Sequence, residues 1–73
     1  DAGMIEEDHR IWASHGQVTI QLDRPAMIRI YTVDGQLIRQ YNNEKEGTKI
    51  VNLPNGIYFI SLNGEGKAKV IVY

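Results

Sequence analysis

The side chains that most often carry chemistry in proteins are few in this sequence and poorly placed for it. The sequence has two histidines, His9 and His15, and no cysteine. His9 follows three acidic residues near the start of the chain, and His15 precedes a glycine in an expected turn. A zinc site needs about four ligands in tetrahedral geometry, and no spacing here brings both histidines to one carboxylate. We therefore expect solvated histidines, no metal centre and no disulfide.

Nucleophiles and paired carboxylates are equally unpromising. Ser14 and Ser61 lie in expected strands without the G-x-S-x-G context of a nucleophile elbow. Glu44 and Glu46 lie in a polar stretch, where solvated carboxylates are far commoner than a raised-pKa acid. The sequence thus predicts no catalytic residues, no cofactor and no enzyme activity.

The size and charge of the chain bound its function further. A chain of 73 residues and 8.3 kDa fits one domain, which buries about 60% of the surface that its unfolded form exposes. Residues 1–8 carry four acids and no base, so their charge is −4, whereas the remaining 8 bases and 9 − 4 = 5 acids give +3. That charge is too weak for a nucleic-acid footprint, and no apolar run approaches the roughly 20 residues of a membrane span.

The acidic start of the chain also suggests a domain boundary. Its like charges and its lack of an apolar pattern are typical of a linker rather than of packed structure. We interpret residues 1–10 as a linker to a preceding domain and residues 11–73 as one folded domain.

Apolar and polar residues alternate with a period of two over most of this domain, which indicates β-strands. Val18, Ile20 and Leu22 give the clearest example. Turn residues separate the segments, and the expected strands are 10–14, 17–22, 26–33, 36–41, 48–53, 57–62 and 67–73. About seven short strands predict an all-β fold, an immunoglobulin-like antiparallel β-sandwich.

The connections between these strands can also be predicted. Asp34-Gly35 indicates a two-residue hairpin loop in which both residues take positive φ. Residues 42–47 contain nothing to bury, so we expect a solvated loop there. Residues 57–62 are apolar on both faces, which predicts a strand in the middle of a sheet.

Two further features of the strands leave alternatives open. The aromatic residues could form a platform for sugar rings, but their spread over four strands favours core and sheet-face positions. Tyr58 follows a Pro54-Asn55-Gly56 corner, so its hydroxyl is expected to bond to a nearby backbone group. Lys67 and Lys69 on the last strand either orient a receptor or only prevent edge-to-edge aggregation.

Three segments stand out near the end of the chain: they read IYTVDGQL at residues 30–37, LPNGIYFI at 53–60 and GKAKVIV at 66–72. Together, in their order and spacing, they resemble the C-terminal sorting domain of type IX secretion in Bacteroidetes. The family usually has Arg or Lys after the hairpin glycine, where this chain has Gln36. The family's motif positions correspond to Asp34, Gly35, Leu53, Pro54, Gly56, Tyr58, Lys67 and Lys69.

The resemblance implies a seven-stranded immunoglobulin-like domain that acts as an address. It implies a covalently attached cargo ahead of the domain, and recognition by the outer-membrane secretion machinery and a sortase-like protease. The protein would be exported, passing through the periplasm to the cell surface or the medium. The alternatives are a small glycan- or protein-binding β-sandwich appended to a surface enzyme, which an exposed row of aromatic residues would favour, and a purely structural spacer.

Overall fold

The computed structural model describes the chain from residue 9 to residue 73, and its side chains from residue 10. This part of the chain forms seven antiparallel strands and no helix that could span a membrane. Residues 1–8, most of the predicted linker, lie outside the described residues, so the linker stays a prediction. The strands are β1 (His9–Ser14), β2 (Gln17–Leu22), β3 (Ala26–Thr32), β4 (Leu37–Glu44), β5 (Gly47–Asn52), β6 (Gly56–Leu62) and β7 (Glu65–Val72).

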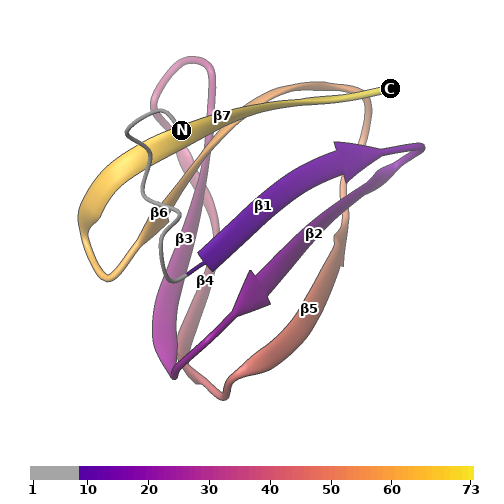
Figure 1. The fold of residues 1–73 in the computed structure, drawn as a ribbon. Coiled ribbons are helices and arrows are strands. Elements are labelled where there is room, and N and C mark those ends of the chain that lie inside the picture. The colour runs from indigo at the N-terminus through magenta and orange to yellow at the C-terminus, as the bar shows by residue number, and fades with distance from the viewer. Residues whose placement is uncertain (1–8) are drawn as a thin grey trace.

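The strands form two sheets, which confirms the predicted β-sandwich (Figure 1). One sheet has the order β1-β2-β5 and the other has the order β4-β3-β6-β7. β6 lies inside its sheet, as its two apolar faces predicted. β4 pairs with β3 in the larger sheet, whereas constant-type immunoglobulin domains place their fourth strand in the sheet that corresponds to β1-β2-β5. β7 is the last strand of the larger sheet, so within the described chain it is an edge strand with a hydrogen-bonded neighbour, β6, on one side.

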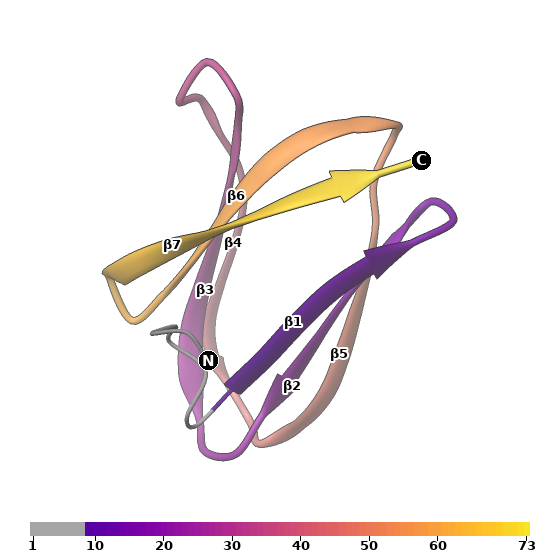
Figure 2. The same cartoon turned by 45° about the horizontal axis from the view of Figure 1, so that its top comes forward.

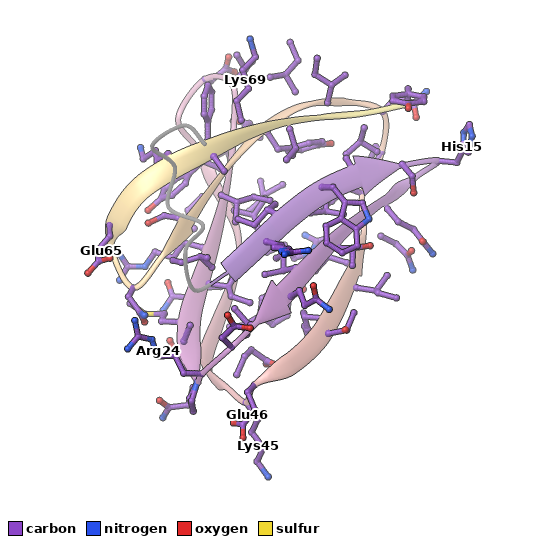
Figure 3. All side chains as sticks on the ribbon, viewed as in Figure 1. His15, Arg24, Lys45, Glu46, Glu65 and Lys69 are labelled. Carbon is purple, nitrogen blue, oxygen red and sulfur yellow. The ribbon has the colours of Figure 1, made fainter. Side chains whose placement is uncertain are left out.

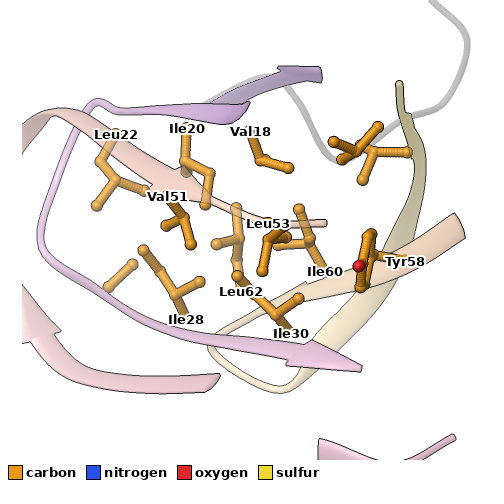
Figure 4. Close-up of a cluster of buried hydrophobic side chains, with 13 residues drawn as sticks. Val18, Ile20, Leu22, Ile28, Ile30, Val51, Leu53, Tyr58, Ile60 and Leu62 are labelled. Atoms are coloured by element: carbon orange, nitrogen blue, oxygen red, sulfur yellow. The ribbon is translucent and has the colours of Figure 1, made fainter. Parts of the chain in front are cut away.

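The core lies between the sheets, and the alternation of each strand supplies it. In the smaller sheet Val18 and Ile20 are fully buried, and in the larger sheet Ile28, Ile30 and Ile60 are fully buried as well (Figure 4). Each such side chain contributes about 1.5–3 kcal/mol through the removal of apolar surface from water. Val70 and Val72 of β7 also belong to this core, so the last strand is part of the folded unit.

The prediction of a solvated loop at residues 42–47 is wrong. β4 continues to Glu44 and β5 begins at Gly47, so only two residues connect them. The polar side chains misled the prediction, because β4 is an edge strand whose side chains are mostly exposed while its backbone pairs with β3. A register shift between Ala26 and Ile28 and the positive φ of Asn43 (55°) mark a bulge in this pairing.

The turn after β3 also differs from the prediction. The Gly35 N–H donates to the Thr32 carbonyl (2.9 Å), and the Thr32 N–H donates to the Gln36 carbonyl (2.9 Å). Within residues 33–36 only Gly35 has positive φ (93°), so the loop has three residues, a tight turn followed by a glycine in the left-handed region. A two-residue loop would force positive φ on Asp34 as well. In the three-residue loop only Gly35 takes positive φ, which glycine adopts at no steric cost.

Two sets of contacts close the sandwich at its ends. Lys49 of β5 lies 4.2 Å from the centre of the Tyr41 ring and 3.7 Å from Glu44, both on β4, and so joins the two sheets. At the other end, Gly16 in the β1–β2 turn donates to the Tyr73 carbonyl (2.9 Å) and accepts from the Leu53 N–H (3.0 Å). The end of the last strand is thus fixed to the first hairpin.

Candidate functional site

The side chains considered for catalysis are dispersed in the structure. Among the described residues no group of three His, Cys, Asp or Glu side chains could hold a metal ion. His15 is exposed and meets the Tyr73 ring edge-on, with ring centroids 5.5 Å apart. Ser61 is buried on a central strand, and Glu44 faces Lys49. The side chain of His9 lies outside the described part of the chain.

The corner before β6 has a structural role. The Tyr58 hydroxyl donates a 2.7 Å hydrogen bond to the Pro54 carbonyl, which confirms the predicted tyrosine corner. Leu53 and Tyr58 are buried in the core, and the Tyr58 hydroxyl lies 3.5 Å from where a Cβ on Gly56 would be. These four motif residues therefore shape the entry into β6, and of the four only Pro54 is exposed.

The β3–β4 turn and the last strand come together at a shallow recess of about 290 Å³. Lys67 of β7 reaches across the outer face of the larger sheet, and its Nζ lies 4.6 Å from the centre of the Tyr31 ring. Phe59 lies beside Tyr31, because the two residues are register partners on β6 and β3. The turn residues 33–35, with Asp34 and Gly35, form the rim. Residues from two motifs far apart in sequence thus line one recess, here called the turn recess.

A second shallow recess of about 300 Å³ lies on the other side of β7. Its walls are residues 11–13 of β1 and residues 69–71 of β7, and it is called the β1 recess here. β1 lies alongside β7 and points the same way, and the two strands converge towards their C-terminal ends (Figures 1 and 2). Lys69 stands at the top of the molecule in Figure 3, on the β7 side of this recess.

β7 is therefore a ridge between two recesses, and its outward side chains Lys67, Lys69 and Ile71 face solvent. The sequence indicated the two lysines but missed Trp12 and Ile71, which are 46% and 55% exposed. Their proximity depends on β1 lying beside β7, and the pattern within either strand says nothing about that.

The chain was also compared with known proteins. The sequence profile of a family described as the secretion system C-terminal sorting domain matches residues 14–73. This span contains β2 to β7 and every residue of the turn recess. Of the β1 recess it contains residues 69–71 but not residues 11–13. Comparisons with curated proteins and with solved structures gave no significant match.

Proposed function

This chain belongs to the secretion system C-terminal sorting domain family, whose members are sorting signals of type IX secretion, and we propose that it acts as a non-catalytic address. The address would serve a cargo protein attached to the domain. The observation that carries the proposal is the family match, which extends over residues 14–73 and so over nearly the whole described fold. The cargo would precede the domain in the chain and would cross the outer membrane to the cell surface.

The proposed partners follow from the same membership. The outer-membrane secretion machinery would recognise the folded domain after the protein reaches the periplasm, and a sortase-like protease would separate it from its cargo at the surface. In this proposal the domain is bound by other proteins and carries out no reaction itself.

The arrangement of β7 supports recognition at the last strand. As an edge strand it has backbone groups without a sheet partner on the side of the β1 recess, where a partner strand would have to enter beside β1, and its lysines add charges that orient the partner. Lys67 and Lys69 are exposed, so their role in a contact would not depend on the core. Asp34 and Gly35 would contribute through the turn recess that they share with Lys67.

The alternative of a glycan-binding module finds no specific support in the described residues. Tyr31 and Phe59 are adjacent on one face but half-buried, and Trp12 lies on the other sheet. Tyr41 and Tyr58 pack against or within the core. These positions do not give the exposed aromatic row on which a sugar ring would stack.

A fusion experiment tests the proposed function. A periplasm-directed reporter is placed ahead of residues 1–73 and expressed in a type IX-competent bacterium and in a mutant without the translocon. The proposal expects surface reporter in the competent strain only. Reporter that stays in the periplasm of both strains, with the domain shown to be folded, would contradict the sorting role.

A further inference from the structure

The outer surface around β7 combines exposed apolar side chains with lysines. Register pairing places Leu37, Tyr31, Phe59 and Lys69 side by side on four consecutive strands, and pairs Ile57 with Ile71 in the next row. Leu37, Ile57 and Ile71 are 44%, 38% and 55% exposed. Neighbouring apolar side chains on one face of a small domain are often a place where another molecule binds.

The charges on this surface are mainly positive along the ridge. Lys67 and Lys69 are two residues apart on one strand, so both point outward and their Cα atoms are separated by about 6.8 Å. The Lys67 ammonium lies over the Tyr31 ring, inside the apolar surface rather than beyond it. A partner that covers this surface must therefore bring negative charge beside apolar groups.

Two other occupants fit the charges less well. A second copy of the chain in a two-fold contact would place the same lysines of both copies on one interface, and like charges there oppose association. An anionic lipid surface attracts clusters of about 4–8 basic residues. On β7 only two lysines face outward, and two acidic residues lie close to them: Asp34 at the rim of the turn recess and Glu65 at the start of β7. Their negative charges oppose binding to an anionic lipid surface.

We propose that the β7 ridge binds an extended protein segment that carries acidic side chains at alternate positions, with an apolar side chain two positions beyond them. In an extended segment alternate side chains share one face with the same repeat of about 6.8 Å as the lysines. Its two carboxylates lie opposite Lys67 and Lys69, and its apolar side chain lies against Ile71 and Trp12 at the β1 recess.

This inference rests on the proposed sorting function in one respect: it describes the chemistry of the protein that would recognise the domain during sorting. The binding itself is argued from the side chains around β7. Each surface ion pair contributes up to about 1 kcal/mol, which is about fivefold in affinity, so two pairs and one apolar contact predict weak binding that falls with salt. Weak binding agrees with two shallow recesses rather than one deep pocket.

Trp12 allows a direct test, because it is the single tryptophan of the chain and lines the β1 recess. The probe is a nine-residue peptide with isoleucine at positions two and eight, glutamate at positions four and six, and threonine elsewhere, so it fits in either direction. One control peptide has lysine in place of glutamate, and another has the two glutamates adjacent. Purified residues 1–73 are titrated with each, following Trp12 fluorescence and the amide resonances of residues 67–71.

The proposal expects saturable changes with the alternating acidic peptide, binding about fivefold weaker with adjacent glutamates, and none with the lysine peptide. Lys69→Glu should weaken binding about fivefold or more, and Ile71→Ser should weaken it as well. Lys45→Glu is the matched control, because Lys45 is exposed in the β4–β5 turn, at the opposite end of the molecule from Lys69 in Figure 3.

Several results would overturn the proposal. These are no saturable change up to millimolar peptide, equal binding of the acidic and lysine peptides, or equal effects of Lys69→Glu and Lys45→Glu. Self-association through this surface, seen by sedimentation and lost in Ile71→Ser, would assign the ridge to a second copy. Tighter binding to anionic vesicles than to neutral vesicles, with no peptide binding, would assign it to lipid. Because the binding test uses the purified domain, peptide binding can fail while the reporter is still exported, and the reporter can fail to be exported while the peptide still binds. The two proposals can therefore fail separately.

Discussion

Removing the hydroxyl of Tyr58 tests the role assigned to the corner before β6. The change Tyr58→Phe removes the 2.7 Å hydrogen bond to the Pro54 carbonyl and keeps the buried ring. A neutral hydrogen bond of this kind contributes about 0.5–1.5 kcal/mol to the free energy of unfolding. Because Pro54 is exposed, water can satisfy its carbonyl in the variant, so we expect a loss of about 1 kcal/mol rather than more.

Thermal and urea unfolding followed by circular dichroism measure this loss. For a domain of this size about 1 kcal/mol corresponds to a fall in Tm of about 4–8 °C. Tyr73→Phe is the control, because the Tyr73 side chain is 62% exposed and makes its ring contact with His15 without the hydroxyl. If Tyr58→Phe were as stable as Tyr73→Phe, the hydrogen bond would not hold the corner and the reasoning would be refuted.

Three further substitutions test the turns and the core by urea unfolding. Gly35→Ala should lose about 1 kcal/mol, because φ is 93° there; unchanged stability would contradict the turn geometry. Asn63→Ala should lose about 1–2 kcal/mol of the free energy of unfolding, since Asn63 has φ 55° and its Oδ1 accepts from the Met27 N–H (2.9 Å). Asn63→Gly loses the same hydrogen bond but adopts positive φ at no steric cost, so it should lose less. A larger loss for glycine than for alanine would contradict a cost of positive φ at this position. Ile60→Val should cost about 0.5–1.5 kcal/mol, because Ile60 is fully buried; no loss would place it outside the packed core.

The sequence predicted much of the fold because the information was local. The alternation of Val18, Ile20 and Leu22 specified which face of β2 is buried, and the two apolar faces of residues 57–62 specified a central strand. The proline and glycine of the 54–56 corner specified the turn, and Tyr58 specified its hydrogen bond.

The failures came where neighbours in space decide the structure. Asn42 and Asn43 have loop-like side chains, yet they lie on β4, because the backbone of that strand pairs with β3. The turn after β3 takes three residues, since the pairing of Thr32 with Gln36 leaves Val33, Asp34 and Gly35 between them.

The candidate surface was predicted only in part for the same reason. Lys67 and Lys69 follow from the strand pattern of residues 67–73. Trp12 reads as an ordinary sheet residue in the sequence, and it lines the same recess as Ile71 because β1 lies along β7. The contact of Lys67 with the Tyr31 ring spans two strands of the sheet that are not adjacent.

The structure also changes how the last strand should be tested. Removing residues 67–73 should abolish export, but it would also remove the buried Val70 and Val72 from the core. A failure of that truncation would therefore not separate lost recognition from lost folding. Changes at exposed side chains avoid this difficulty.

The most direct measurement is surface delivery of the reporter in the competent strain with the double variant Lys67→Ala and Lys69→Ala. Both lysines are exposed, so the variant should stay folded and lose at most the Lys67 contact with the Tyr31 ring, about 0.5–1 kcal/mol of the free energy of unfolding. The account predicts clearly less reporter at the surface than with the unchanged domain or with Lys45→Ala, and reporter retained in the periplasm. Equal surface reporter for all three would contradict recognition through β7 and leave the lysines with a role only in preventing edge-to-edge aggregation.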